Sequence, residues 1–132
     1  MKKNLMLLAL AFALATASAQ TYTGTMTIGT YTQHNVKVDV QRQNDSTVAL
    51  TLRHVKFARM MPVRLDVRIA PVRLSAAGSL HADGAVPTAK GKSYEKYTVR
   101  RLTGHHAAAE TSFTCQMGTK KMQFSGRRNA DR

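Results

Sequence analysis

Few side chains in this chain suit nucleophilic or acid–base catalysis. Cys115 is the only cysteine, and it alternates with Phe113 and Met117 on the apolar side of a two-residue repeat. A thiol in that setting is predicted to be a small buried hydrophobic group and not an activated thiolate. Asp66 and Glu110 have no carboxylate partner at a spacing that suits acid–base work, and no glycine-rich phosphate loop is present. We therefore expect a protein that is not an enzyme.

The five histidines show no recognisable metal-binding pattern. His105 and His106 are adjacent and would point to opposite sides of an extended strand. A structural metal site usually takes four ligands, and the other histidines, His34, His54 and His81, have no ligand spacing to this pair. The sequence predicts ordinary surface histidines, with no metal and no cofactor.

The amino-acid composition indicates anion binding. Lys and Arg number 20 against seven Asp and Glu, a formal charge of +13. Such a surface attracts phosphates, sulfates and carboxylates, although the same charge also keeps a small domain soluble. Aromatic residues do not interleave with the basic ones as nucleic-acid platforms require, so no specific nucleic-acid partner is expected. The candidate anion-binding residues, at outward positions of expected strands, are Arg64, Arg68, Arg100 and Lys121.

The first 19 residues have the pattern of a secretory signal peptide. Lys2 and Lys3 precede an apolar run over 5–14, and a small-x-small cleavage pattern stands at 17–19. The run is too short for a membrane-spanning helix. Cleavage would leave 113 residues with a formal charge of +11, enough for one domain. We expect a soluble protein exported through the inner membrane, to the periplasm or beyond.

The elements that must position these side chains are predicted to be β-strands. Apolar and polar residues alternate with period two, which is typical of antiparallel strands with one buried face. Turn residues separate these runs, Pro62 and Pro71 bracket one of them, and the polar segment 83–93 is expected to be a loop. This spacing predicts an all-β sandwich or barrel. The alternating runs cover 36–40, 48–52, 63–69, 113–117 and 122–124.

Four segments, in this order, carry a resemblance: YTGTMTI at 22–28, VALTLRHV at 48–55, MPV at 61–63 and MQFSG at 122–126. Together they resemble the calycin-like (lipocalin-like) secreted barrels common in Bacteroidetes. The resemblance implies one antiparallel up-and-down barrel of roughly eight strands over 20–126, then a basic tail at 127–132, and it carries no catalytic residues. The chain lacks tryptophan and so departs from the Gly-x-Trp signature of true lipocalins.

The interior of such a barrel has two interpretations. Eight strands leave room for a filled core or for one small ligand, and the mid-sized to large inward residues favour a mostly filled core. Flexible methionines in the loop before Pro62 suit an adaptable apolar site at the barrel mouth. The candidate ligand-binding residues are Met26, Leu50, Met60, Met61, Val67, Phe113, Met117 and Phe124.

One modification site is also predicted. Asp45-Ser46-Thr47 resembles the O-glycosylation signal of Bacteroidetes and falls at an expected hairpin tip. Ser46 and Thr47 are the candidate acceptors, and a plain turn is the alternative.

Two functional hypotheses follow. The first is a non-catalytic exported binding module, for a small apolar ligand at the barrel mouth or for an anionic glycan or lipopolysaccharide on the basic surface. The second is a structural or accessory protein of the cell envelope that makes protein contacts.

Overall fold

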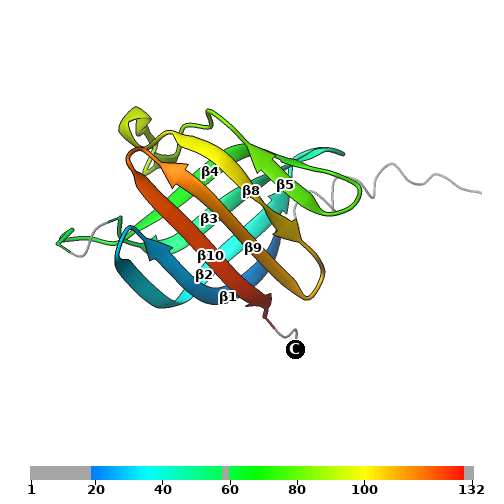
Figure 1. Cartoon of the computed structure of the whole chain (residues 1–132), viewed down its shortest axis with the longest axis horizontal. Helices are drawn as coiled ribbons and strands as arrows, with labels where there is room; N and C mark the ends of the chain where they lie inside the picture. The colour runs from blue at the N-terminus through cyan, green and yellow to red at the C-terminus, as the bar shows by residue number, and fades with distance from the viewer. Residues whose placement is uncertain (1–18, 58–59, 130–132) are drawn as a thin grey trace, which may run out of the picture.

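The computed structural model describes residues 19–57 and 60–129, and within them eight strands form a closed antiparallel barrel (Figure 1). Each strand pairs with the next along the chain, and β1 pairs with β10 to complete the ring. The predicted all-β barrel of roughly eight strands is therefore confirmed. The predicted signal peptide lies outside the described residues, apart from Ala19. The strands are β1 (Ala19–Ile28), β2 (Tyr31–Arg42), β3 (Thr47–Val55), β4 (Leu65–Leu74), β5 (Ser79–Ala82), β8 (Val99–His106), β9 (Glu110–Met117) and β10 (Lys120–Arg128).

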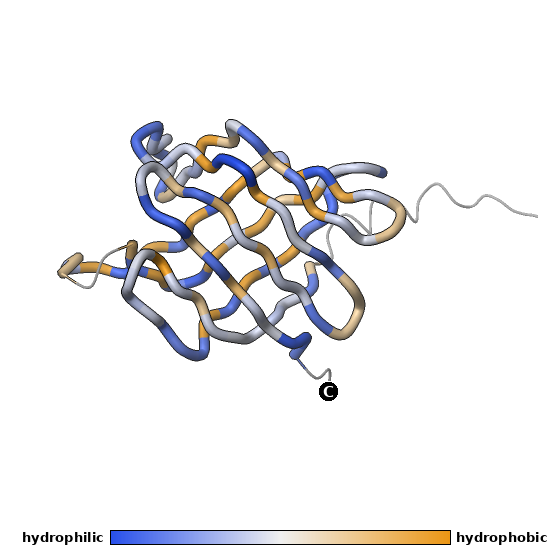
Figure 2. Tube along the Cα trace, in the orientation of Figure 1, coloured by the Kyte–Doolittle hydropathy of each residue, from blue (hydrophilic) through white to orange (hydrophobic). Residues whose placement is uncertain are grey.

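Alternation along each strand separates the inside of the barrel from the outside. In β2, Val36, Val38 and Val40 are at most 4% exposed, whereas Lys37 between two of them is exposed. Figure 2 shows the same alternation of hydropathy along the strands in front and behind. Burial of one apolar row per strand stabilises the barrel and fixes the register, because a slip of one residue would expose the whole row.

Large side chains fill the middle of the barrel. The rings of Phe113 and Phe124 lie 5.5 Å apart, and both residues are at most 2% exposed. Cys115 is buried, and burial raises the pKa of its thiol to about 12. In the described residues the core is therefore filled through its centre, and it contains the buried thiol of Cys115.

Close contact between neighbouring strands requires glycine at particular positions. A Cβ on Gly104 of β8 would collide with the carbonyl oxygen of Ser112 and would lie 2.6 Å from the Cβ of Phe113 in β9. Glycine removes this clash, so β8 and β9 can approach closely at this position.

One end of the barrel is covered by the connection between β5 and β8. This connection contains β6 (Thr88–Ala89), β7 (Lys92–Ser93) and the 3₁₀-helix η2 (Glu95–Tyr97). The ring of Tyr97 packs against that of Phe57 at 4.7 Å, and Lys120 Nζ donates a hydrogen bond of 3.1 Å to the Phe57 carbonyl. Part of the segment expected to be a loop, 83–93, therefore forms a short hairpin that pairs with β4.

Two boundary predictions differ from the structure. The strand expected to start at Val63 starts at Leu65, so Val63 is 51% exposed and Arg64 lies in the preceding loop. Pro71 lies inside β4 and not at its end. A strand tolerates proline where pairing is irregular, and the β3–β4 register shifts beside it, between Val48 and Leu50.

Candidate functional site

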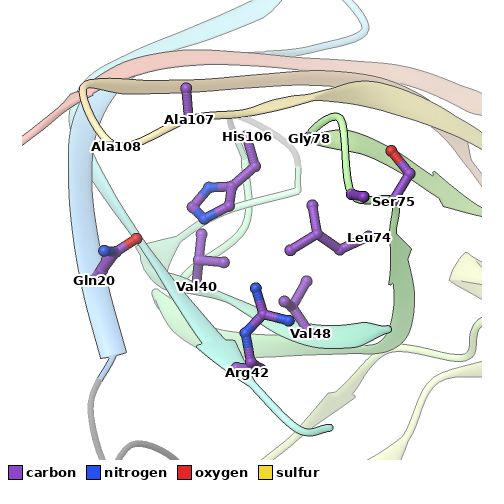
Figure 3. Close-up of a pocket in the computed structure, with 11 residues that line it drawn as sticks. Gln20, Val40, Arg42, Val48, Leu74, Ser75, Gly78, His106, Ala107 and Ala108 are labelled. Atoms are coloured by element: carbon purple, nitrogen blue, oxygen red, sulfur yellow. The ribbon is translucent and has the colours of Figure 1, made fainter. Parts of the chain in front are cut away.

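The opposite end of the barrel holds an open pocket of about 560 Å³ (Figure 3). This end lies to the right in Figure 1, where β1 begins and where β2, β4 and β8 end. The volume is within the range of small-molecule sites. The lining residues are Gln20, Val40, Arg42, Val48, Leu74, Ser75, Ala76, Gly78, His106, Ala107 and Ala108.

The floor of this mouth pocket is apolar. Val40 of β2, Val48 of β3 and Leu74 of β4 continue the inward rows of their strands and are at most 8% exposed. In Figure 3 their side chains lie between His106 and Arg42. An apolar group that enters the mouth would therefore contact aliphatic side chains.

Arg42 supplies the positive charge of the mouth pocket. It continues the inward row of β2 at the strand's last position, which directs its guanidinium into the pocket (Figure 3). Its Nη1 donates hydrogen bonds to the carbonyl oxygens of Asp45 (3.1 Å) and Asn44 (3.4 Å). Among the described residues no carboxylate lines the pocket, and Arg42 forms no ion pair with any of them. Its charge is therefore open to an anion.

His106, at the end of β8, is the second polar group of the pocket. Its ring meets the Tyr22 ring edge-on at 5.5 Å, and its Nδ1 lies 2.8 Å from Thr111 Oγ1. Burial lowers the pKa of His106, and the positive charges of Arg42 and His105 lower it further. The imidazole is therefore neutral at pH 7 and acts as a hydrogen-bonding group.

Tyr22 supports the rim from below. Its side chain is fully buried, and its hydroxyl lies 2.7 Å from the carbonyl oxygen of Ala107 and 3.0 Å from Gln20 Oε1. These contacts hold the β8–β9 turn and the start of β1 together on one side of the pocket. The pocket is thus largely preformed, and the Ser75 hydroxyl and the His106 imidazole are the potential nucleophiles among its lining side chains.

The predicted ligand-binding residues lie elsewhere, and none of them lines the mouth pocket. Met60 and Met61 belong to the β3–β4 loop at the covered end, where Met60 is 89% exposed and Met61 packs on the core. Met61 Sδ accepts a hydrogen bond from the Phe57 amide at 3.3 Å. The other six, all at most 2% exposed, form the filled centre: Met26, Leu50, Val67, Phe113, Met117 and Phe124.

The four predicted anion-binding residues are all exposed but fall into two groups. Arg64 and Arg68 lie before and within β4, whereas Arg100 of β8 and Lys121 of β10 both neighbour Gln116 of β9. In Figure 1 the strands of the second group lie in front and β4 lies behind. The fold therefore does not bring the four together.

The predicted acceptors of a glycan lie beside the mouth pocket. Ser46 is exposed in the β2–β3 turn, and Thr47 begins β3 half-buried. Asn44 Oδ1 accepts hydrogen bonds from the amides of Ser46 (2.9 Å) and Thr47 (3.0 Å), which fixes this turn.

Sequence reasoning missed Arg42, His106 and Gln20, although a signal was present. Each continues the inward row of its strand at or next to one end: Arg42 follows Val40 by two at the end of β2, and Gln20 precedes Tyr22 by two at the start of β1. A polar residue at an inward position belongs at a barrel mouth, because only there can it reach solvent.

Comparisons with protein-family models, curated proteins and solved structures find no match to this chain. In the described residues no helix is long and apolar enough to cross a membrane. Within the same residues no group of three or more histidine, cysteine and acidic side chains could hold a metal ion.

Proposed function

We propose that this protein is a non-catalytic binding protein that takes a small amphipathic acid at the mouth pocket. The observation that carries the proposal is Arg42, an arginine that has no carboxylate partner among the described residues and stands over an aliphatic floor. The guanidinium would bind the acidic head group through charge-assisted hydrogen bonds. Val40, Val48 and Leu74 would contact its apolar body.

His106 fits the same ligand. A neutral imidazole beside Arg42 can donate or accept a hydrogen bond without adding a fixed charge. A bound carboxylate would favour the protonated ring and so raise the pKa of His106. Binding should therefore be visible at this histidine as well as in the affinity.

The proposal also covers the cellular compartment of the protein and its family relationship. The signal-peptide pattern supports export to the periplasm or beyond, and the barrel supports kinship with calycin-like secreted proteins. Native mass spectrometry of protein from its own host would show a co-purifying acid as a constant added mass, and an unmodified Ser46-Thr47 peptide would end the glycosylation hypothesis. A bare mass would favour the alternative of a cell-envelope scaffold.

The binding test compares octanoate with octanol, which share a chain and differ in charge. Calorimetry should give at least about tenfold tighter binding of octanoate, because a charged hydrogen bond contributes about 1.5–3 kcal/mol. Arg42→Gln should remove this preference. Arg127→Gln, the same change at an exposed position of β10, should keep it. Equal binding of acid and alcohol, or an unchanged preference in Arg42→Gln, would overturn the proposal.

A further inference from the structure

A second hollow, of about 330 Å³, lies on the outer wall of the barrel and is separate from the mouth pocket. It forms over β2, β3 and the loop before β4. Its chemistry is set by cationic and hydrogen-bonding side chains, and no carboxylate from the described part of the chain lines it. The polar lining consists of His34, Asn35, Lys37, Arg53, His54 and Arg64.

Irregular backbone produces this wall hollow. Asn35 and His54 both have a left-handed backbone, with φ of 58°, which side chains other than glycine adopt at a cost. The β1–β2 register shifts next to Asn35, and the β3–β4 register shifts at His54. Two bulges in neighbouring strands therefore coincide at one hollow, and bulges are common where a strand must redirect side chains for function.

The charges around the hollow are partly neutralised in an ordered way. Arg53 lies 2.7 Å from Asp39 Oδ2 and 3.5 Å from Asp66 Oδ2, and Asp66 Oδ1 also accepts the His54 amide at 2.8 Å. Both nearby carboxylates, Asp39 and Asp66, are thus already paired with Arg53, and Asp66 also accepts the backbone amide of His54 in the bulge. Asp39 and Asp66 fix the wall and leave the other cations unpaired.

Two cations remain for a ligand. Among the described residues the side chain of Lys37 forms no hydrogen bond and no ion pair. The guanidinium of Arg64 reaches only neutral oxygens, Gln33 Oε1 and the His54 carbonyl, both at 3.4 Å. The rings of His34 and His54 add four further nitrogen donors or acceptors, two from each ring.

We propose that the wall hollow is a binding site for a tetrahedral oxyanion, a phosphate or sulfate group. Lys37 and Arg64 would contact its oxygens, and the two histidines would add hydrogen bonds. Such a group needs several donors that converge on one compact charge, and the two bulges supply that convergence. The site is independent of the mouth pocket, so either can fail without the other.

The test is an NMR titration of the full chain with inorganic phosphate and, separately, inorganic sulfate, at constant ionic strength. Saturable shifts should centre on the amides of Asn35, Lys37 and His54. The double variant Lys37→Gln, Arg64→Gln should weaken binding by about tenfold or more. The control Arg100→Gln, Lys121→Gln loses the same charge from the other wall and should change the affinity less than about threefold.

Three outcomes would overturn the proposal: shifts spread evenly over the basic surface, equal losses in the two double variants, or no saturable shift. If the hollow double variant does not fold, Lys37→Gln alone decides, since Lys37 has no partner within the described residues to lose. Comparison of the two titrations also identifies the ligand, because tighter binding of one anion distinguishes recognition of phosphate from recognition of sulfate.

Discussion

At the scale of single residues, the polar side chains of the mouth pocket occupy positions that would otherwise belong to the core. Arg42, His106 and Gln20 each continue an inward row. Gln20 accepts a hydrogen bond from the Tyr22 hydroxyl, Arg42 donates to the turn carbonyls, and His106 Nδ1 lies 2.8 Å from Thr111 Oγ1. A barrel mouth can therefore carry charge that the barrel centre would exclude.

His106 should make the stability of the protein depend on pH. Its pKa is lower in the folded protein than in the unfolded chain, where histidine has a pKa of about 6.5. As the pH falls, the unfolded chain binds the proton first. The contribution of neutral His106 is thus complete above about pH 6.5 and is lost as the pH falls through the folded value.

The measurement is the urea midpoint between about pH 8 and pH 5 for the native sequence and for His106→Gln. The variant should show a shallower fall in stability below about pH 6.5. His105→Gln, at the exposed neighbour, should keep most of the slope. Parallel curves for the native sequence and His106→Gln would contradict the assignment.

At the scale of strands, the β8–β9 pair depends on a missing side chain. Gly104→Ala would push a methyl group against the Ser112 carbonyl and Phe113. The strands would have to separate, and we expect a loss of about 1–3 kcal/mol in the free energy of unfolding. Urea denaturation measures this loss.

The control for that variant is Thr103→Ala, next to it in β8 and exposed. It should change the unfolding free energy by no more than about 0.5 kcal/mol. Equal stability of the Gly104→Ala variant and the native sequence would show that the strand pair can relax.

The strands are the part of this fold that the sequence predicts best. The valines at 36, 38 and 40 and the run from Phe113 to Met117 identify their strands, because burial on one face imposes a strict period of two. The start of β4 was misplaced, since Val63 extends the same pattern although it is half exposed. The covered end was also missed, because β6 and β7 have two residues each and show no period.

The site was less predictable than the strands. Sequence alone does not say which end of a barrel is covered, so the methionine loop was taken as the mouth. That choice depends on how Phe57 and Tyr97 pack, a contact between residues 40 positions apart. The only signal of the mouth pocket in the sequence is the polar residue at the end of several inward rows, such as Arg42 after Val40.

At the scale of the whole molecule, the positive charge should attract polyanions to the surface but should not determine which ligand the mouth pocket binds. Basic side chains are spread around the barrel, and the chain has a formal charge of +13. We expect retention on a heparin column that falls steeply as salt rises from about 0.05 to 0.5 M, because exposed charges are screened. Octanoate binding should change less over this range.

The comparison separates two kinds of recognition. Retention that persists at high salt would point to a specific polymer site in place of diffuse attraction. Retention that is already absent at low salt would show that the spread of charges is too thin to hold a polyanion.

The two ends of the described chain have a practical consequence. Gln20 lines the mouth pocket, and the Asn129 amide donates a 2.9 Å hydrogen bond to the Thr21 carbonyl, so both ends meet at the mouth. A purification tag or a fused reporter attached directly before Gln20 or directly after Asn129 would start beside the pocket rim and compete with its ligand. Immobilisation chemistry belongs instead at the far turns, where an engineered cysteine at the exposed Thr119 would leave the entrance free.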